Sequence, residues 1–271
     1  MHEIALKDLQ KVCLKILVDI HQFCIDNNVR YSIAYGTLIG AVRHKGFIPW
    51  DDDVDIIMPR PDYERFCKIY CSSSYRLVYY GNDRRALTGF ARVVDDQETL
   101  FKAERPWTKQ IIGAWVDIFP IDGVEDDVIQ YAKRYEQLRK RCNIIYKFRR
   151  QNHHLSMKDS WWSITKTIIA RTVGLNGYLP YWLLLKMVKM EMRVNYDKAK
   201  YLGQCSCLDD GPNQFPKEDF ADYTLLDFEN YHFYALRGYD HHLRQLYGDY
   251  MQLPPEEKRI PKQYWIKFCW K

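Results

Sequence analysis

Long apolar runs and targeting signals are missing from this sequence of 271 residues. No stretch of about 18 uncharged apolar residues occurs, which predicts that no helix spans a bilayer. The N-terminus, MHEIALKDLQKVCLKIL, has no basic stretch leading into an apolar core, so no secretory signal is predicted. The eight cysteines are scattered and form no CxxC pair. This usage argues against a metal knuckle and favours reduced thiols in a cytosolic protein.

A large net charge is missing as well. The formal charge of +5 is too small for a nucleic-acid-binding tail, and no nucleic acid partner is expected. The mild excess favours anionic partners such as nucleotides, polyphosphates or an anionic membrane surface. A hydrophobic content of 47% and an aromatic content of 15% argue against disorder. The chain is therefore expected to form one large globular unit, or a catalytic domain with a helical appendage.

Apolar periodicity predicts an α+β fold, with a mixed sheet in the N-terminal part of the chain and mostly helices after it. We expect a catalytic core at residues 1–125 and a largely helical region at residues 126–271. Pro120 is expected to end a strand, and Gly36-Thr37 to separate a strand from a helix. The predicted strands are 31–35, 54–58, 76–80, 90–94 and 114–119. The predicted helices are 5–28, 38–42, 62–69, 126–151, 161–173, 178–196 and 239–247.

The stretch Trp50-Asp51-Asp52-Asp53-Val54-Asp55 contains four acids at the start of an apolar strand. Side chains at positions i and i+2 of a strand point to the same face, so Asp53 and Asp55 should project together. Two close carboxylates repel each other, and a hard divalent cation such as Mg²⁺ relieves this. Asp51 and Asp52 are interpreted as loop acids. The alternative is a surface acidic turn that caps the strand.

A third acid, Asp117, is the only charged residue in the strand-like run from Ile111 to Ile121. Metal-assisted phosphoryl transfer needs carboxylates from neighbouring strands that converge on one phosphate. Asp117 is therefore a candidate third ligand, or a base for an incoming hydroxyl. The alternative is a carboxylate at the end of a strand that caps a turn.

A glycine turn and several cations provide candidate phosphate ligands. Gly36 would let the backbone approach a phosphate closely, and the Thr37 hydroxyl would face the anion at a helix N-terminus. Arg43 could clamp a phosphate, and His44 could hold a phosphate oxygen or protonate a leaving group; a loop histidine is otherwise a solvent-exposed residue. Arg92 would neutralise donor phosphates, or would form a structural ion pair with one of the acids.

The stretch YGTLIGAVRHKGFIPWDDDVDIIMPRPDYERF, Tyr35 to Phe66, resembles the signature of the LicD family of nucleotidyltransferase-fold enzymes. The resemblance continues in GAWVDIFPID, residues 113–122, in Phe228-Glu229, and in YGDYMQLPPEEKR, residues 247–259. After Glu229 the chain departs from the family pattern. It has Asn230 and then Ala235-Leu236-Arg237 where the family often has a glycine and then a proline.

The resemblance implies transfer of a phospho-alcohol from a CDP-alcohol, typically CDP-choline, to a sugar hydroxyl of a cell-surface glycan. Teichoic acid, lipopolysaccharide and capsule are the acceptor classes, and CMP would leave. Asp53 and Asp55 fall on the metal-binding pair of the family, and Asp117 falls on its third acid. Gly36-Thr37 fall on its phosphate-facing turn. The expected cofactor is one or two Mg²⁺ ions, for which Mn²⁺ would substitute.

The segment from Lys133 to Arg150 holds eight Lys or Arg residues and one Glu, and an aromatic segment follows at 161–185. One interpretation is contact with an anionic membrane surface, which would place the enzyme in the cytoplasm at the inner face of the membrane. A lipid-linked glycan acceptor would suit that location. The alternatives are a solvated basic helix and a docking site for a phosphate-rich polymer.

Two further functions remain open. The same carboxylates would serve a nucleotidyltransferase that adenylates a small molecule, since only the orientation of the donor differs. A non-catalytic binding protein on the same fold is the other alternative. The acids at positions 53, 55 and 117 argue against it.

Overall fold

The computed structural model describes residues 2–103, 113–150, 161–162, 165, 175–206, 211–261 and 266–271. The described strands are β1 (Ser32–Ile33), β2 (Asp55–Pro59), β3 (Arg76–Val78), β4 (Ala91–Asp95), β5 (Thr99–Ala103), β6 (Ala114–Val124), β7 (Tyr201–Gly203), β8 (Phe215–Pro216), β9 (Tyr223–Phe228), β10 (Tyr231–Leu236) and β11 (Ile266–Trp270). The α-helices are α1 (Leu6–Asp26), α2 (Tyr35–Ile39), α3 (Arg60–Ile69), α4 (Val128–Arg150), α6 (Leu175–Glu191) and α7 (Tyr239–Tyr247). Shorter helical turns are η1 (Gly40–His44), η2 (Tyr196–Lys198), η3 (Lys217–Phe220) and η4 (Glu256–Lys258).

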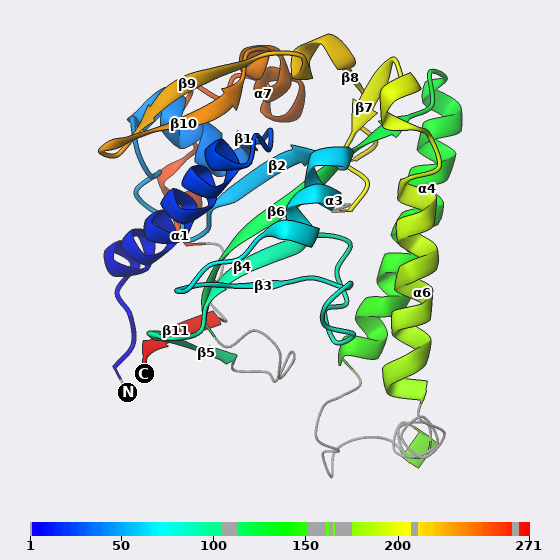
Figure 1. Ribbon diagram of the computed structural model, residues 1–271, viewed down its shortest axis with the longest axis horizontal. Helices are drawn as coiled ribbons and strands as arrows, with labels where there is room; N and C mark the ends of the chain where they lie inside the picture. Colours follow the sequence, from blue (N-terminus) through cyan, green and yellow to red (C-terminus); the bar gives the residue numbers. More distant parts are fainter. Residues whose placement is uncertain are drawn as a thin grey trace.

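A mixed sheet forms the centre of the molecule (Figure 1). Its strands follow the order β1-β2-β6-β4-β3, and β7 and β8 extend it from β6. Strand β2 is parallel to β6, whereas β4 and β7 pair with β6 in the antiparallel direction. This sheet and its flanking helices confirm the predicted α+β class. The C-terminal half also contributes strands, because β7 pairs with β6 and β11 pairs with β5.

Strand β6 is the central strand, and every residue from Ala114 to Val124 is buried. The prediction that Pro120 ends this strand is wrong. The N–H of Asp117 donates to the carbonyl of Val54, the residue before β2, so residues 118, 120 and 122 direct their nitrogens to the other side of β6. On that side β4 pairs with β6 only as far as Ile118, and β7 pairs with β6 only from Asp122 onward. Pro120 therefore lies in a gap of the ladder, where a missing N–H removes no hydrogen bond.

Helices α1 and α3 pack against the sheet. Helix α1 buries one stripe of apolar side chains, as its 3.6-residue periodicity predicts. These buried residues are Leu9, Val12, Cys13, Ile16, Leu17, Ile20 and Cys24. Together with Ile56, Ile118 and Phe66 they belong to the largest apolar core cluster. The β9–β10 hairpin lies beside β1, where the N–H of Leu236 donates to Ser32 Oγ at 3.0 Å.

Helices α4 and α6 pack side by side at one side of the molecule (Figure 1). Leu138 and Ile145 of α4 join Leu184, Met187 and Val188 of α6 in a separate apolar cluster. The predicted helix at 178–196 ends earlier, at Glu191, and η2 follows it. The predicted helix at 161–173 falls mostly outside the described residues. No described helix is long and apolar enough to cross a membrane.

The glycine turn also differs from its prediction. Helix α2 begins at Tyr35, so Gly36 and Thr37 lie inside the helix instead of separating it from a strand. Tyr35 has a positive φ of 49°, which turns the chain sharply from β1 into the helix. The helix then continues through the π-helical turn η1, so that His44 is helical and not part of the following loop.

Candidate active site

Three charged side chains lie in a row across the sheet. Asp55 of β2 is the register partner of Asp117 on β6, and Asp117 is the register partner of Arg92 on β4. Residues paired directly across neighbouring strands project from the same face, so these side chains share one face. The tertiary structure thus brings together three predicted site residues that are up to 62 positions apart in the sequence.

Asp117 and Arg92 form an ion pair at the centre of this row. Arg92 Nε lies 2.5 Å from Asp117 Oδ1, and both side chains are mostly buried. Trp115 donates from Nε1 to Asp117 Oδ2 at 3.1 Å, and its ring lies beneath the Arg92 guanidinium at 4.7 Å. Burial raises the pKa of the Asp117 carboxyl, although Arg92 and Trp115 both lower it. Of the two interpretations of Arg92, the ion pair is the one that the structure displays.

The acids before β2 form a compact cluster. Carboxylate oxygens of Asp51, Asp52 and Asp53 lie within 4.8 Å of one another. In the described part of the chain, neither Asp55 nor Asp117 belongs to this group. Asp53 nevertheless lies close enough to Asp117 for its negative charge to raise the pKa of that carboxyl. Asp51 and Asp52 lie in a loop, as predicted. Their proximity to Asp53 was not predicted from the sequence.

Asp51 is buried against the start of α2. A Cβ atom at Gly36 would lie only 2.3 Å from Asp51 Oδ2, so position 36 accommodates the carboxylate because it has no side chain. The loop is also held from α1, where Gln10 Nε2 donates to the carbonyls of Ile48 at 3.3 Å and Asp51 at 2.8 Å. The missing side chain at Gly36 thus makes room for Asp51, and the predicted contact of Gly36 with a phosphate stays a prediction.

Thr37 links α2 to the strand that carries Asp55. Its Oγ1 accepts a hydrogen bond from the backbone N–H of Asp55 at 3.0 Å. The hydroxyl proton of Thr37 is not used in this bond, so the predicted role in phosphate binding stays a prediction. The contact shows that Thr37 positions Asp55.

Arg43 and His44 lie in η1, and Arg43 faces the C-terminal part of the chain. Arg43 Nη1 donates to the carbonyls of Tyr250 at 2.5 Å and Gln252 at 3.0 Å. The ring of His44 meets the ring of Trp50 edge-on at 6.3 Å. Burial, and then the charge of Arg43, lowers the pKa of His44. Arg43 thereby anchors the segment 247–259 beside the carboxylate loop, and its predicted phosphate contact stays a prediction.

Glu229 is a contributor to the site that residue chemistry alone did not single out. Its Oε1 accepts the N–H of Phe47 at 3.0 Å, and its own N–H donates to the carbonyl of Lys45 at 2.8 Å. It occupies the space that a side chain at Gly46 would need. In the sequence, Glu229 was marked only by its place in the motif Phe228-Glu229, which assigned it no chemical role. Nothing in the sequence marked Gln10, since it is one polar residue on a helix.

A second buried network lies beyond the carboxyl end of β2. Arg60 donates to both carboxylate oxygens of Asp122 at 2.6 Å, and its Nη2 lies 3.3 Å from Glu191 Oε2. Arg134 donates to the carbonyls of Glu191 and Gly123. Burial raises the pKa of Glu191 to about 8. This network connects α3, β6, α4 and α6. It buries Arg134, so this member of the basic segment 133–150 is not a surface cation.

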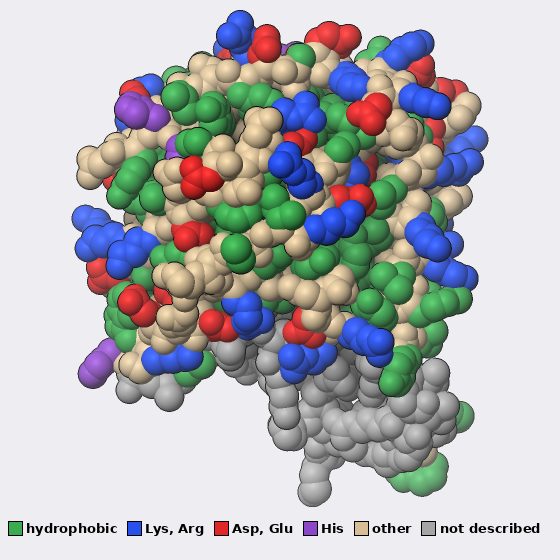
Figure 2. Space-filling model, in the orientation of Figure 1, with side chains coloured by type: hydrophobic (Ala, Val, Ile, Leu, Met, Phe, Trp, Pro, Cys, Tyr) green, Lys and Arg blue, Asp and Glu red, His purple; other side chains and the backbone are tan. Residues whose placement is uncertain are grey.

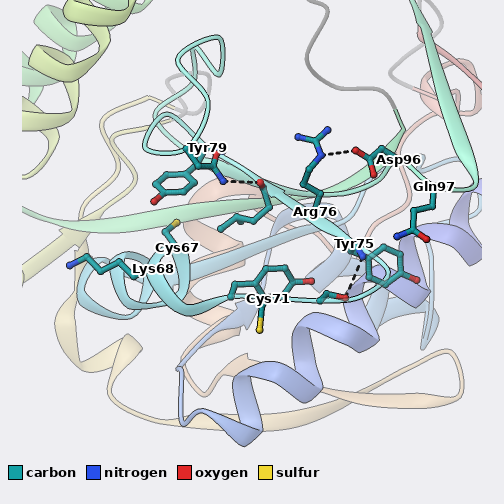
Figure 3. Close-up of a pocket in the computed structure, with 12 residues that line it drawn as sticks. Cys67, Lys68, Cys71, Tyr75, Arg76, Tyr79, Asp96 and Gln97 are labelled. Atoms are coloured by element: carbon teal, nitrogen blue, oxygen red, sulfur yellow. Dashed lines mark hydrogen bonds and ion pairs between the residues drawn. The ribbon is translucent and has the colours of Figure 1, made fainter.

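An open hollow of about 770 Å³ lies at the end of α3, away from these carboxylates (Figure 3). Cys67, Cys71 and Tyr75 line it, together with Arg76, which forms an ion pair with Asp96 at 2.6 Å. None of the predicted site residues lines this hollow. It therefore plays no part in the candidate active site.

Residues 28–166 match the family described as LicD/FKTN/FKRP, nucleotidyltransferase domain. The lipopolysaccharide cholinephosphotransferase LicD of Haemophilus influenzae is 33% identical over 273 aligned positions, which cover 96% of this chain and 97% of that protein. The chain belongs to the LicD family. As a LicD-family protein with this likeness over nearly its whole length, it is a phosphotransferase.

Two shorter matches lie in uncharacterized proteins of Rickettsia. One from Rickettsia typhi is 46% identical over 55 residues, or 20% of this LicD-family chain and 18% of that protein. One from Rickettsia prowazekii is 52% identical over 42 residues, or 16% of each chain. The predicted catalytic and phosphate-binding residues of the LicD-family chain, from Gly36 to Asp117, all fall inside the family match.

Proposed function

We propose that this chain transfers phosphocholine from CDP-choline to a sugar hydroxyl of a cell-surface glycan and releases CMP. The observation that carries the proposal is the row Asp55–Asp117–Arg92 with Asp53 beside it, in a chain that aligns almost completely with a cholinephosphotransferase. The name of the Haemophilus relative gives lipopolysaccharide as its acceptor, and we extend this acceptor class to the present chain. The donor proposed for the present chain, CDP-choline, is the one that the family resemblance implies.

The carboxylates fit a divalent metal site. Their oxygens are the hard ligands that Mg²⁺ prefers, and Asp51, Asp52 and Asp53 already lie within 4.8 Å of one another. The family resemblance assigns the metal to Asp53, Asp55 and Asp117, of which Asp53 belongs to this cluster, and Mn²⁺ would replace Mg²⁺. When bound, the metal supplies positive charge that stabilises the developing charge on the diphosphate oxygens.

The reaction is an in-line displacement at phosphorus. The acceptor hydroxyl oxygen forms a bond to the phosphorus that carries choline, and the bond from that phosphorus to the bridging oxygen of CMP breaks. CMP leaves with the electron pair, and the hydroxyl proton is released. Arg92 holds the Asp117 carboxylate in place, and Thr37 holds the backbone of Asp55. The protein thereby fixes the carboxylates before the donor arrives, which is how phosphoryl transfer is mostly catalysed.

Donor choice tests the proposal against adenylation of a small molecule. The purified chain is incubated with Mg²⁺ and either CDP-choline or ATP, and CMP and pyrophosphate are measured. We expect CMP from CDP-choline and no pyrophosphate from ATP. Pyrophosphate release, or no CMP in the presence of a deacylated lipopolysaccharide acceptor, would contradict the proposal. Asp53→Asn is the matched loss-of-function control, and an unchanged rate in that variant would favour a non-catalytic role for the acids.

A further inference from the structure

Exposed aromatic side chains gather at the far end of the α4–α6 pair. Trp161 is 81% exposed, Trp162 74%, Tyr178 73% and Trp182 50%, and Ile144 of α4 is 45% exposed. Single exposed apolar residues are normal on a protein surface, but several large rings at one end of a helix pair are not. In the view of Figure 1, segment 161–162 lies beyond the end at which α4 finishes and α6 begins.

The position of this end follows from the buried network. Arg134 donates to the carbonyl of Glu191, which places these two residues at the same level of the antiparallel pair. At 1.5 Å per residue, Ile144 and Trp182 lie about 15 Å farther from that level. Arg84 of the loop between β3 and β4 lies over the ring of Tyr181 at 5.9 Å, so this end contacts that loop and not the strands that carry the carboxylates.

Cations accompany the rings. Lys186 Nζ lies 3.6 Å from the ring centre of Trp182, and Lys189 is exposed one turn farther along α6. On α4 the side chains of Arg139 and Lys140 are 55% and 73% exposed. Glu136 is the single acid between Lys133 and Arg150, and it forms ion pairs with both of these cations. Figure 2 shows Lys and Arg side chains beside hydrophobic ones along the edge of the molecule where α4 and α6 lie.

We propose that this end of the helix pair, defined by Ile144, Trp161, Trp162, Tyr178, Trp182, Lys140 and Lys186, binds the surface of an anionic phospholipid membrane. Tryptophan and tyrosine rings reside at the level of lipid headgroups, where one part of the ring is dry and the other wet. Lysines beside them meet the anionic headgroups. An interface with a second protein fits less well, because lysine is depleted at the centre of protein interfaces whereas here it covers the ring of Trp182.

Co-sedimentation with vesicles tests this proposal independently of catalysis. The full chain is mixed with vesicles of phosphatidylcholine, with or without phosphatidylglycerol, at low and at high salt. We expect binding to the anionic vesicles that weakens as salt is added, and little binding to phosphatidylcholine alone.

Variants identify the surface. Lys140→Gln and Lys186→Gln should each weaken vesicle binding about fivefold, since each charge near an anionic surface contributes about 1 kcal/mol. Trp161→Ala combined with Trp162→Ala, and Trp182→Ala alone, should also weaken it. The matched controls are Tyr231→Ala, an exposed ring on β10, and Lys11→Gln, an exposed cation on α1, both of which should bind as the parent does. All these side chains are exposed, so melting temperatures should stay unchanged.

Three outcomes would overturn the proposal. The first is equal binding of the parent to anionic and to zwitterionic vesicles. The second is unchanged vesicle binding in the tryptophan and lysine variants. The third is a loss of self-association in these variants without any loss of vesicle binding, which would identify a second copy of the chain as the occupant of this surface.

Discussion

The hydroxyl of Thr37 accepts the backbone N–H of Asp55 at 3.0 Å, across 18 residues of sequence. Thr37 is buried in helix α2, and Asp55 is the first residue of strand β2. One side chain therefore fixes where the helix that follows β1 meets the strand that carries a predicted metal ligand. The contact makes Thr37 a positioning residue whatever the chemistry of the site.

Replacement of Thr37 by valine should misplace Asp55. Valine has nearly the same shape but accepts no hydrogen bond, so the N–H of Asp55 loses its partner at a cost of about 1–3 kcal/mol. We expect a lower free energy of unfolding and a higher Mg²⁺ concentration for half-maximal CMP release. Thr37→Ser keeps the oxygen and should resemble the parent in both measurements. Equal Mg²⁺ dependence of the two variants would show that the contact has no role in the site.

Gly36→Ala should introduce a clash with Asp51. The new Cβ would lie 2.3 Å from Asp51 Oδ2, so the carboxylate must move or the helix must shift. Overpacking of this kind costs about 1–3 kcal/mol, which denaturant unfolding measures. Combining Gly36→Ala with Asp51→Ala removes the clash and should restore part of the stability. If the double variant is less stable than Gly36→Ala alone, the assigned contact is wrong.

The ion pair between Arg92 and Asp117 should couple strongly to stability. Arg92→Met leaves the Asp117 carboxylate mostly buried without its cation, and breaking a buried pair costs about 3–5 kcal/mol. Asp117→Asn in the same chain removes the stranded charge and should recover part of that loss. A double-mutant cycle on the free energy of unfolding measures the coupling. Additive effects of the two changes would contradict a direct pair.

Glu191 should make stability depend on pH between neutrality and about pH 8. Its folded pKa of about 8 lies above its usual value of 4.5, so the folded chain holds an extra proton between these values. Stability must then fall as pH rises through that window. His242, whose pKa burial lowers to about 4, opposes this below about pH 6.5, because there it gains a proton more easily in the unfolded chain.

The difference between the parent and Glu191→Gln isolates this term. From pH 6.5 to 8 we expect the free energy of unfolding of the parent to fall by about 1–2 kcal/mol relative to the variant. Chemical denaturation at several pH values measures it. Glutamine keeps the size and the hydrogen bond to Arg60, so cavity effects do not enter. Parallel pH profiles for the two chains would show that Glu191 stays ionised in the folded protein.

Local sequence determined the elements whose periodicity is long and clean. The apolar stripe of α1 and the boundaries of α7 were predictable because side chains three and four residues apart share a helix face. The apolar run after Asp53 predicted β2 to within one residue. The acidic residues were also identifiable, since carboxylates at the edge of a buried strand require partners.

Tertiary structure alone decided which partners these residues have. Asp117 pairs with Arg92 because β4 lies antiparallel to β6 in one particular register, which no local pattern specifies. Pro120 stays within a strand because the ladder has a gap beside it. Arg43 binds carbonyls more than 200 residues away, and Asp51 fills the space above Gly36. The sequence by itself determined the chemistry that the site can offer, because it fixes the residue types and their local spacing. The fold decided which carboxylates and cations meet, because those contacts join distant segments.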